Sequence, residues 1–254
     1  MVFEGCTPNL VKFNTLIDLY VKTGQWQEAM GVLDTLQEHG IQPEVRTYNT
    51  IITACNKSSR PEEGLAIHER MVRAGVKPTA TTYTALISAY GKQGKVAQAM
   101  GIFADMVARG CERNVITYSS LISAYGKQGK VAQAMGIFAD MVARGCERNV
   151  ITYSSLISAA EKAGRADLAL QLFERMHQEG CRPNVVTYNS LIAACAHSAH
   201  WEDAERCFQQ MAAQGCTPDG ITFSALITAF ERGGQWRRAL GAYGQMTAQV
   251  GIQH

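Results

Sequence analysis

Apolar side chains recur in this chain at the spacing of one face of an α-helix. In the first such segment Phe13, Leu16, Ile17 and Tyr20 stand at i, i+3, i+4 and i+7, which places them on one side of a helix. A later segment has the broader apolar stripe expected of a helix flanked by neighbours. That stripe consists of Ala169, Leu170, Leu172, Phe173 and Met176. The pattern predicts an all-helical protein in which each helix buries one face.

This helical pattern repeats with a period of 35 residues. Each copy opens with an aromatic residue followed by a small polar residue, and these pairs are Phe13-Asn14, Tyr48-Asn49, Tyr83-Thr84, Tyr118-Ser119, Tyr153-Ser154, Tyr188-Asn189 and Phe223-Ser224. A turn residue lies near the middle of each copy, an Ala-rich second segment follows, and a glycine closes it. We therefore predict an all-α, right-handed α-solenoid of tandem 35-residue helix-turn-helix repeats, in which neighbouring repeats bury a continuous core.

The period also predicts the domain organisation. Residues 1–9 have the pattern of the tail of a preceding repeat, and about seven repeats follow, at 10–44, 45–79, 80–114, 115–149, 150–184, 185–219 and 220–254, the last of them incomplete. The closing glycines stand where a helix C-terminus favours a residue without Cβ; they are Gly40, Gly75, Gly110, Gly145, Gly180 and Gly215. Neither end carries a distinctive cap, so exposed apolar end faces could drive self-association.

Two neighbouring stretches are identical. Leu86–Ala124 repeats as Leu121–Ala159, while the other copies have diverged. A recent tandem duplication or a deliberate design would both produce this identity, and the sequence does not choose between them.

Charge and cysteine content narrow the function classes. The chain has 24 basic and 22 acidic residues, so total charge argues neither for nor against a polyanionic partner. No apolar run approaches the ~18 residues of a membrane span, and we expect no membrane partner.

Four cysteines recur at one repeat position; they are Cys111, Cys146, Cys181 and Cys216, and Cys6 shares their context. Stacked repeats would hold them about 8–10 Å apart, beyond the ~7 Å limit for a disulfide, so we predict small buried thiols in a reducing compartment.

The repeat unit resembles the pentatricopeptide repeat family over nearly the whole chain. It opens with Thr-Tyr-Asn-Ser-Leu-Ile (187–192) and closes with Gly-Cys-Thr-Pro-Asp (215–219). Tetratricopeptide repeats run at 34 residues and carry a Trp-x-x-Leu-Gly-x-x-Tyr pattern that is absent here. The resemblance implies single-stranded RNA binding with one base read per repeat, in RNA processing, stability or translation in a chloroplast or mitochondrion. It implies neither catalysis nor a cofactor.

One face of each first helix is polar and ends in a cation. At about 100° per residue, the positions just after the aromatic, four further and eight further lie opposite the core face. The residue after the aromatic is always Asn, Ser or Thr, which are poor helix formers and good partners for base edges, although Ser and Thr near helix starts could instead be N-caps. The basic position either contacts phosphates or merely complements the helix dipole. It holds Lys22, Lys57, Lys92, Lys127, Lys162, His197 and Arg232.

In the resembling family, the opening polar residue reads a base together with the residue thirty positions later. The pairs Thr84 with Asn114, Ser119 with Asn149, and Ser154 with Asn184 then imply adenine, and Asn189 with Asp219 implies uracil. Asn49 with Thr79 suggests a pyrimidine, Asn14 with Glu44 is unusual, and Ser224 has no closing partner. The implied core is 5′-AAAU-3′, preceded by two pyrimidines. Residues two before the aromatic would sandwich bases; they are Val11, Arg46, Thr81, Ile116, Ile151, Val186 and Ile221.

Other site signatures are missing from the sequence. Gly-Lys-Gln-Gly-Lys (91–95 and 126–130) lacks the spacing of a phosphate loop and sits at a turn between helices. His197 and His200 have helical spacing but no accompanying ligand cluster, and no zinc deaminase motif occurs. We expect no metal, no cofactor and no catalytic residue. The runner-up function is a protein- or peptide-binding scaffold, which would not require an Asn/Ser/Thr column paired with an Asn/Asp column.

Overall fold

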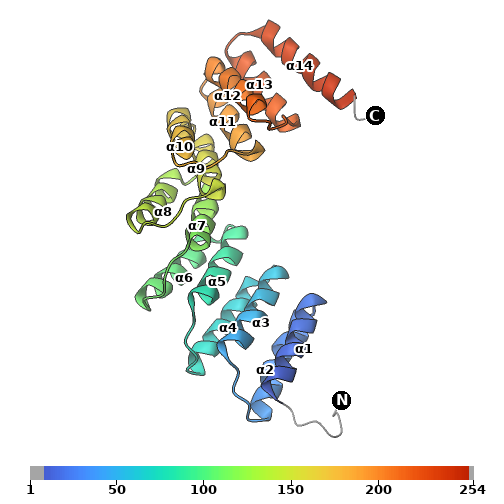
Figure 1. Cartoon of the computed structure of the whole chain (residues 1–254), viewed down its shortest axis with the longest axis vertical. Coiled ribbons are helices and arrows are strands. Elements are labelled where there is room, and N and C mark those ends of the chain that lie inside the picture. The colour runs from blue at the N-terminus through green and yellow to red at the C-terminus, as the bar shows by residue number, and fades with distance from the viewer. Residues whose placement is uncertain (1–8, 252–254) are drawn as a thin grey trace. The chain divides into compact units, whose positions relative to one another are not determined.

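The protein folds into helical hairpins, as the periodicity predicts. The computed structural model describes the backbone of residues 9–251 and the side chains of residues 9–248. Within that range it contains fourteen α-helices and no β-strand, which confirms the all-α solenoid of helical repeats (Figure 1). The helices are α1 (Leu10–Lys22), α2 (Trp26–Glu38), α3 (Val45–Lys57), α4 (Pro61–Arg73), α5 (Ala80–Lys92), α6 (Val96–Ala108), α7 (Val115–Lys127), α8 (Val131–Ala143), α9 (Val150–Lys162), α10 (Ala166–Gln178), α11 (Val185–His197), α12 (Trp201–Ala213), α13 (Gly220–Arg232) and α14 (Trp236–Gly251). The predicted tail at residues 1–9, apart from Asn9, and Cys6 within it lie outside the described residues.

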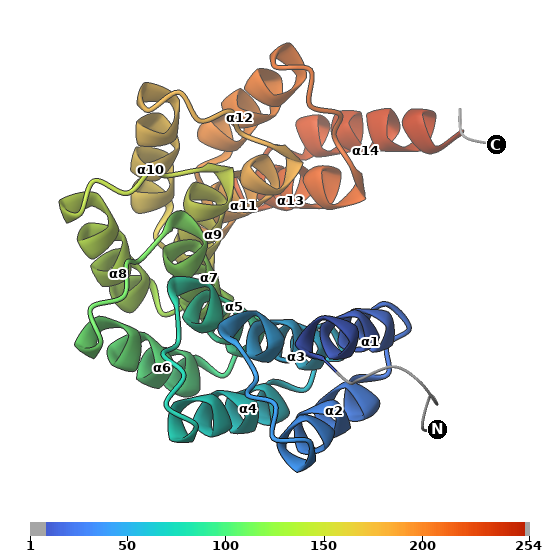
Figure 2. The same cartoon turned by 60° about the horizontal axis from the view of Figure 1, so that its bottom comes forward.

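The chain forms two compact units, residues 1–117 and 118–254. In the first unit, α1 packs on α3 and α3 on α5, and each also packs on its hairpin partner. In the second unit, α9, α11 and α13 pack in the same order. Within each unit the first helices of the hairpins lie side by side in one layer and the second helices form the other layer (Figure 2). No helix in the described part of the chain is long and apolar enough to cross a membrane.

The buried face is the one that the apolar spacing predicts. In α5, Tyr83, Leu86, Ile87 and Tyr90 are all buried, because this helix packs against α3, α4 and α6. In α1 only Ile17 of the predicted stripe is fully buried, since α1 packs on α2 and α3 alone among the described helices. The stripe of α10 is buried as predicted, except that Leu170 remains partly exposed.

The closing glycines terminate the second helices. All six have φ between +66° and +75°, a region that costs a residue with Cβ about 1–2 kcal/mol. At Gly110 the amide donates to the carbonyl of Val107, and the next amide, from Cys111, donates to Met106. This is the hydrogen-bond pattern of a Schellman cap, as the sequence predicts.

The cysteines that recur at one repeat position are free thiols among the described residues. They are half-buried rather than buried, which corrects the expectation from sequence. They are half-buried because they follow the capping glycine directly, and there the thiol lies against a carbonyl group near the end of the preceding repeat. Cys111 Sγ lies 3.8 Å from the carbonyl oxygen of Pro78, and Cys216 Sγ lies 3.8 Å from that of Pro183.

A carboxylate ties the end of α10 to the preceding repeat. Glu179 accepts from Arg148 Nε at 2.8 Å and from Arg175 Nε at 3.1 Å. Burial raises the pKa of this carboxyl, but the hydrogen bond from Arg148, supported by Arg175, outweighs it and lowers the pKa to about 2 from an ordinary 4.5. Because the folded-state pKa is depressed, the stabilisation is fully present above pH 4.5 and is lost as the pH falls through about 2.

We therefore expect Glu179→Gln to lower the free energy of unfolding at pH 6 by about 1–2 kcal/mol. The difference in unfolding free energy between the variant and the natural chain, which is the gap to be measured, should disappear as the pH falls below about 2. Urea unfolding across this pH range measures it. Glu174→Gln, which alters an exposed carboxylate of the same helix, is the control and should show no such gap. A gap for Glu179→Gln that is independent of pH would contradict the ionic account.

Candidate nucleic-acid interface

A column of large aliphatic side chains stands exposed at the start of the first helices. Val11, Ile116, Ile151, Val186 and Ile221 are 56–71% exposed, although single exposed aliphatics are ordinary on any protein surface. What is unusual is that all five occupy one position of the repeat, two residues before the core aromatic. Arg46 and Thr81, which hold the same position in α3 and α5, are also exposed. The predicted base-sandwiching column is therefore accessible in both units.

The closing residues of the repeats are the N-caps of the helices that follow them. Asn149 and Asn184 each accept the amide of the threonine three residues on, at 3.0 Å, and Asp219 accepts that of Thr222 at 2.8 Å. Asn114 does the same at 2.9 Å, and Glu44 and Thr79 cap α3 and α5. The sequence-based alternative that the Ser or Thr after the aromatic caps the helix is therefore wrong, because these residues lie one turn inside it.

In the third to sixth repeats the opening residue is more buried than predicted. Thr84, Ser119, Ser154 and Asn189 are only 5–9% exposed, whereas helical geometry alone put them on an open face. The reason is the neighbouring repeat, whose third helical residue, a buried threonine, lies directly against them. Ser224, which opens the last repeat, is exposed.

That threonine brings the opening and closing residues together. Ser154 Oγ lies 2.7 Å from Thr187 Oγ1, which in turn lies 2.9 Å from Asn184 Oδ1. In the next repeat Asn189 Nδ2 donates directly to Asp219 Oδ1 at 3.1 Å. The residue pairs that the resemblance implies are thus neighbours across each junction, although they are thirty positions apart in sequence.

The same link holds in the other repeats. Thr84 lies 2.9 Å from Thr117, and Ser119 lies 3.0 Å from Thr152. Asn14 Oδ1 accepts from Thr47 at 2.8 Å and Asn49 Oδ1 accepts from Thr82 at 2.7 Å. Sequence reasoning missed this threonine, even though an N-cap residue followed three positions later by a hydroxyl is a recognisable capping pattern.

Asp219 holds its charge at neutral pH. Burial raises the pKa of its carboxyl, but hydrogen bonds from the backbone amide of Thr222 and from the side-chain amide of Asn189 lower the pKa below its usual value. A carboxylate that is ionised accepts hydrogen bonds and donates none. The closing side chains therefore differ in kind, since the Asn repeats have an amide with donors where this repeat has acceptors only.

The predicted phosphate column is exposed at all seven positions, which are Lys22, Lys57, Lys92, Lys127, Lys162, His197 and Arg232. In this column Lys162 and Arg232 also bond to the end of the preceding first helix. Lys162 Nζ donates to the carbonyl of Lys127 at 3.1 Å, and Arg232 donates to that of His197 at 3.3 Å. This favours the helix-dipole role for these two side chains, and phosphate contact stays a prediction for the column.

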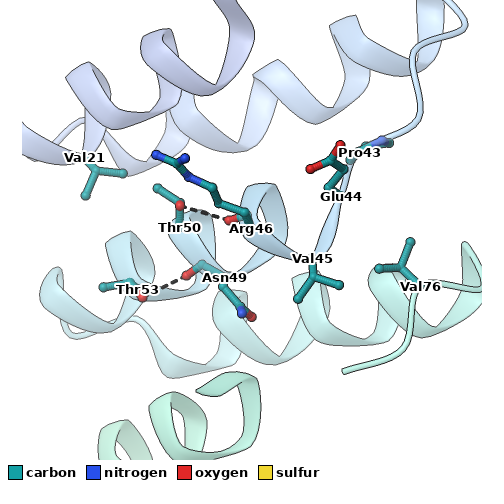
Figure 3. A pocket seen from close by; sticks show the side chains of 9 residues that line it. All are labelled: Val21, Pro43, Glu44, Val45, Arg46, Asn49, Thr50, Thr53 and Val76. Carbon is teal, nitrogen blue, oxygen red and sulfur yellow. Dashed lines mark hydrogen bonds between the residues drawn. The ribbon is translucent and has the colours of Figure 1, made fainter. Parts of the chain in front are cut away.

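A groove runs along α3, the first helix of the second repeat, and is also bordered by Val21 of α1 (Figure 3). Its volume is about 850 Å³ and it is lined by Val21, Pro43, Glu44, Val45, Arg46, Asn49, Thr50, Thr53 and Val76. The opening residue Asn49, the sandwich-position residue Arg46 and the closing residue Glu44 all border it. Arg46 lies 3.6 Å from Asp18. Among the described side chains, no three His, Cys, Asp or Glu residues gather as metal ligands.

Sequence models of one family match the chain in successive segments. The model described as PPR repeat family matches residues 8–57, 43–92, 81–126 and 183–232. The pentatricopeptide repeat domain matches residues 136–198, and the PPR repeat matches 116–146 and 221–249. No curated protein sequence matches the chain.

Solved structures show the same architecture. The crystal structure of the pentatricopeptide repeat protein PPR10 from maize has a TM-score of 0.71 and 31% identity, covering 96% of this chain and 35% of that one. PPR10 in complex with an 18-nt psaJ RNA element has a TM-score of 0.65 and 30% identity, covering 95% and 34%. The PPR domain of Arabidopsis thaliana protein-only RNase P 1, in complex with tRNA, shares the fold at 17% identity, with a TM-score of 0.64 and coverage of 78% and 98%. The chain thus spans about a third of the maize protein, and with its repeat models covering more than half of its length, it belongs to the pentatricopeptide repeat family.

Proposed function

We propose that this chain binds single-stranded RNA, one nucleotide per repeat, and that it reads a site of the form 5′-YYAAAU-3′. The observation that carries the proposal recurs from repeat to repeat. An exposed side chain stands at the sandwich position, and a buried threonine links the opening residue to the closing residue by hydrogen bonds. The complex of the maize relative with an RNA element supports RNA as the partner. The family resemblance extends the proposal to a role in RNA processing, stability or translation in an organelle.

The hydrogen-bonding groups that the closing Asn leaves for a ligand favour adenine in the third, fourth and fifth repeats. In each, the oxygen of the closing Asn accepts both the amide and the hydroxyl of the linking threonine, at 2.9 and 3.0 Å for Asn114, 3.0 and 3.1 Å for Asn149, and 3.0 and 2.9 Å for Asn184. The group left for a ligand is the Nδ2 amino group, a donor. Adenine offers an acceptor at N1 beside its amino donor, and the neighbouring Ser or Thr oxygen can accept from that amino group.

The sixth repeat has the opposite character. Asp219 Oδ1 is occupied by the amide of Thr222 and by Asn189 Nδ2, which leaves acceptor capacity on the carboxylate. Asn189 keeps a second N–H donor. Uracil presents an N3–H donor flanked by carbonyl acceptors, and this combination matches it.

The exposed Ile and Val side chains supply the remaining contact. A base placed between two such side chains in successive repeats loses water from both faces, and base stacking on protein side chains is worth about 1–3 kcal/mol where the side chain is aromatic. Arg46 would cover one base with its planar guanidinium instead. The bases of a duplex are already paired and stacked, so this mode requires a single strand.

The direct test is fluorescence anisotropy of labelled RNA carrying 5′-CCAAAU-3′, measured alone and after annealing to its complement at the same salt concentration. The single strand is expected to bind and the duplex to bind at least about tenfold more weakly, since pairing occupies the edges that the protein reads. Equal binding of the two forms would refute single-strand recognition.

The cation column makes a separate prediction. Replacing Lys92, Lys127 and Lys162 together with Ala should weaken binding to all sequences alike, and three lost phosphate contacts at about 0.7 each should flatten the dependence of log K on log salt by roughly 2. The matched control changes Lys95, Lys130 and Arg165, which stand at the starts of α6, α8 and α10 and remove the same charge. If the dependence of log K on log salt is unaltered in the variant lacking Lys92, Lys127 and Lys162, these lysines do not contact the phosphates.

A further inference from the structure

A buried threonine occupies the third position of every first helix after α1. These residues are Thr47, Thr82, Thr117, Thr152, Thr187 and Thr222, and none is more than 1% exposed. In α1 the same position holds Lys12. The threonines are therefore not themselves accessible to a ligand, although each lies between the two side chains that we assign to base reading.

At each junction one hydroxyl serves several partners. Thr187 Oγ1 lies 2.7 Å from Ser154 Oγ and 2.9 Å from Asn184 Oδ1, and it accepts the backbone amide of Asn184 at 3.3 Å. Thr222 Oγ1 lies 2.6 Å from Asn189 Oδ1 and 2.9 Å from Asp219 Oδ1, and accepts the amide of Asp219 at 3.0 Å. Thr152 repeats the arrangement of Thr187.

A hydroxyl has one hydrogen and two lone pairs, so these contacts constrain one another. When the Thr187 hydrogen goes to Asn184 Oδ1, one lone pair holds the Asn184 amide and the other must accept the hydrogen of Ser154. The Asn184 side-chain oxygen then stays bonded at the N-terminus of α11, and its amino group is available to donate to a base. The Ser154 oxygen, having donated its hydrogen to Thr187, can only accept from the base. In the next repeat the short contact sends the Thr222 hydrogen to Asn189 Oδ1, which leaves Asn189 Nδ2 to donate to Asp219.

We propose that this threonine is a positioning residue of the RNA code, fixing which hydrogen-bonding groups the two reading side chains present to the base. The inference rests on the proposed function. Because a hydroxyl rotates, it accepts from Ser or Thr in some repeats and donates to Asn in others. One residue type can therefore serve repeats with different base preferences, while its β-branched carbon restricts χ1 and holds the oxygen at the junction.

The test is Thr187→Val, which keeps the shape and removes the hydroxyl. Asn184 still caps the helix through the Val amide, so we expect the variant to fold. The preference for adenine over the other three bases at the fifth nucleotide should fall by about threefold to tenfold, the worth of one hydrogen bond. Preferences at the other nucleotides should not change. Thr187→Ser should restore the preference, and Thr152→Val should transfer the loss to the fourth nucleotide.

The readout is a four-base substitution series at each nucleotide at fixed salt. Thr35→Val is the control, because its hydroxyl donates to Gly31 within α2, far from the reading pairs in the repeat. If Thr187 were only a stabilising residue, Thr187→Val would lower the melting temperature and weaken all four bases by one factor, and the inference would fall while RNA binding stood.

A measurement without RNA separates the inference from the function. In ¹⁵N relaxation of the Asn184 side-chain amide, the natural chain should show an ordered group and Thr187→Val a mobile one. If the natural chain shows no base preference at all, the proposed function fails and the code role of Thr187 with it. An amide that is equally ordered in both proteins would overturn the positioning role directly.

Discussion

Replacing Asn184 with Asp will move the preference at the fifth nucleotide from adenine toward guanine, by about 1–3 kcal/mol if the contact is well aligned. The Asn amino group donates, which suits N1 of adenine. A carboxylate only accepts, and guanine offers N–H donors at N1 and N2. The cap should survive, because Asp219 already caps α13 with the same contact to the threonine three residues on, and Asp and Asn are equivalent at this position.

The measurement is a titration of both proteins against the four bases at the fifth nucleotide, with salt held constant. Asn149→Asp is the matched control, since its repeat has the same network and should transfer the same change to the fourth nucleotide. Equal loss of affinity for all four bases, or a shift at a nucleotide other than the fifth, would show that Asn184 does not read the base assigned to it.

Gly126→Val should destabilise the second unit by about 3 kcal/mol, the upper end of what overpacking costs. A Cβ at Gly126 in α7 would lie 2.7 Å from the backbone carbonyl oxygen of Ser155 in α9, closer than real Cβ atoms approach. The obstacle is backbone rather than a flexible side chain, so relief requires the two helices to separate. The spacing of neighbouring repeats, and with it the junction between Ser119 and Thr152, would change.

Gly136→Val supplies the control, since it places the same residue in a helix of the same unit, where nothing lies within 4 Å of the added Cβ. Helix propensities of Gly and Val differ by only a few tenths of a kcal/mol, so its stability should stay within about 0.5 kcal/mol of the natural chain. Chemical denaturation of the two variants makes the comparison. Similar stabilities would mean that α7 and α9 do not approach as closely as described.

The repeat pattern was enough to predict the hairpins. The 35-residue spacing of the aromatic residues, the apolar stripe of α10 and the glycine after each second helix are all local signals, because each follows from helical geometry or from a single backbone angle. The first helices accordingly begin 35 residues apart, from Leu10 to Gly220. The half-burial of the recurring cysteines was not predictable in the same way, since it depends on a carbonyl of another repeat.

The site was less predictable, because its geometry depends on neighbouring repeats. Viewed as an isolated helix, α9 leaves Ser154 on an open polar face, but Thr187 of the following repeat covers it. The double role of Asn184, as cap of one helix and closing residue of the previous repeat, also requires the junction. The position of Lys162 on its helix predicts a phosphate contact. Its hydrogen bond to the carbonyl of Lys127 could not be predicted from that helix alone, because Lys127 lies on another helix.

The central claim, that successive repeats read successive bases in one direction, is tested most directly by binding the Asn184→Asp variant to 5′-CCAAGU-3′ and to 5′-CCGAAU-3′ in the same flanking sequence. The two RNAs have identical charge and base composition, so phosphate contacts cannot distinguish them. We predict that the first binds at least about tenfold more tightly at fixed salt, since the second RNA places mismatched bases at two repeats and each mismatch costs a hydrogen-bonded contact. Equal affinities, or tighter binding of the second RNA, would contradict the account.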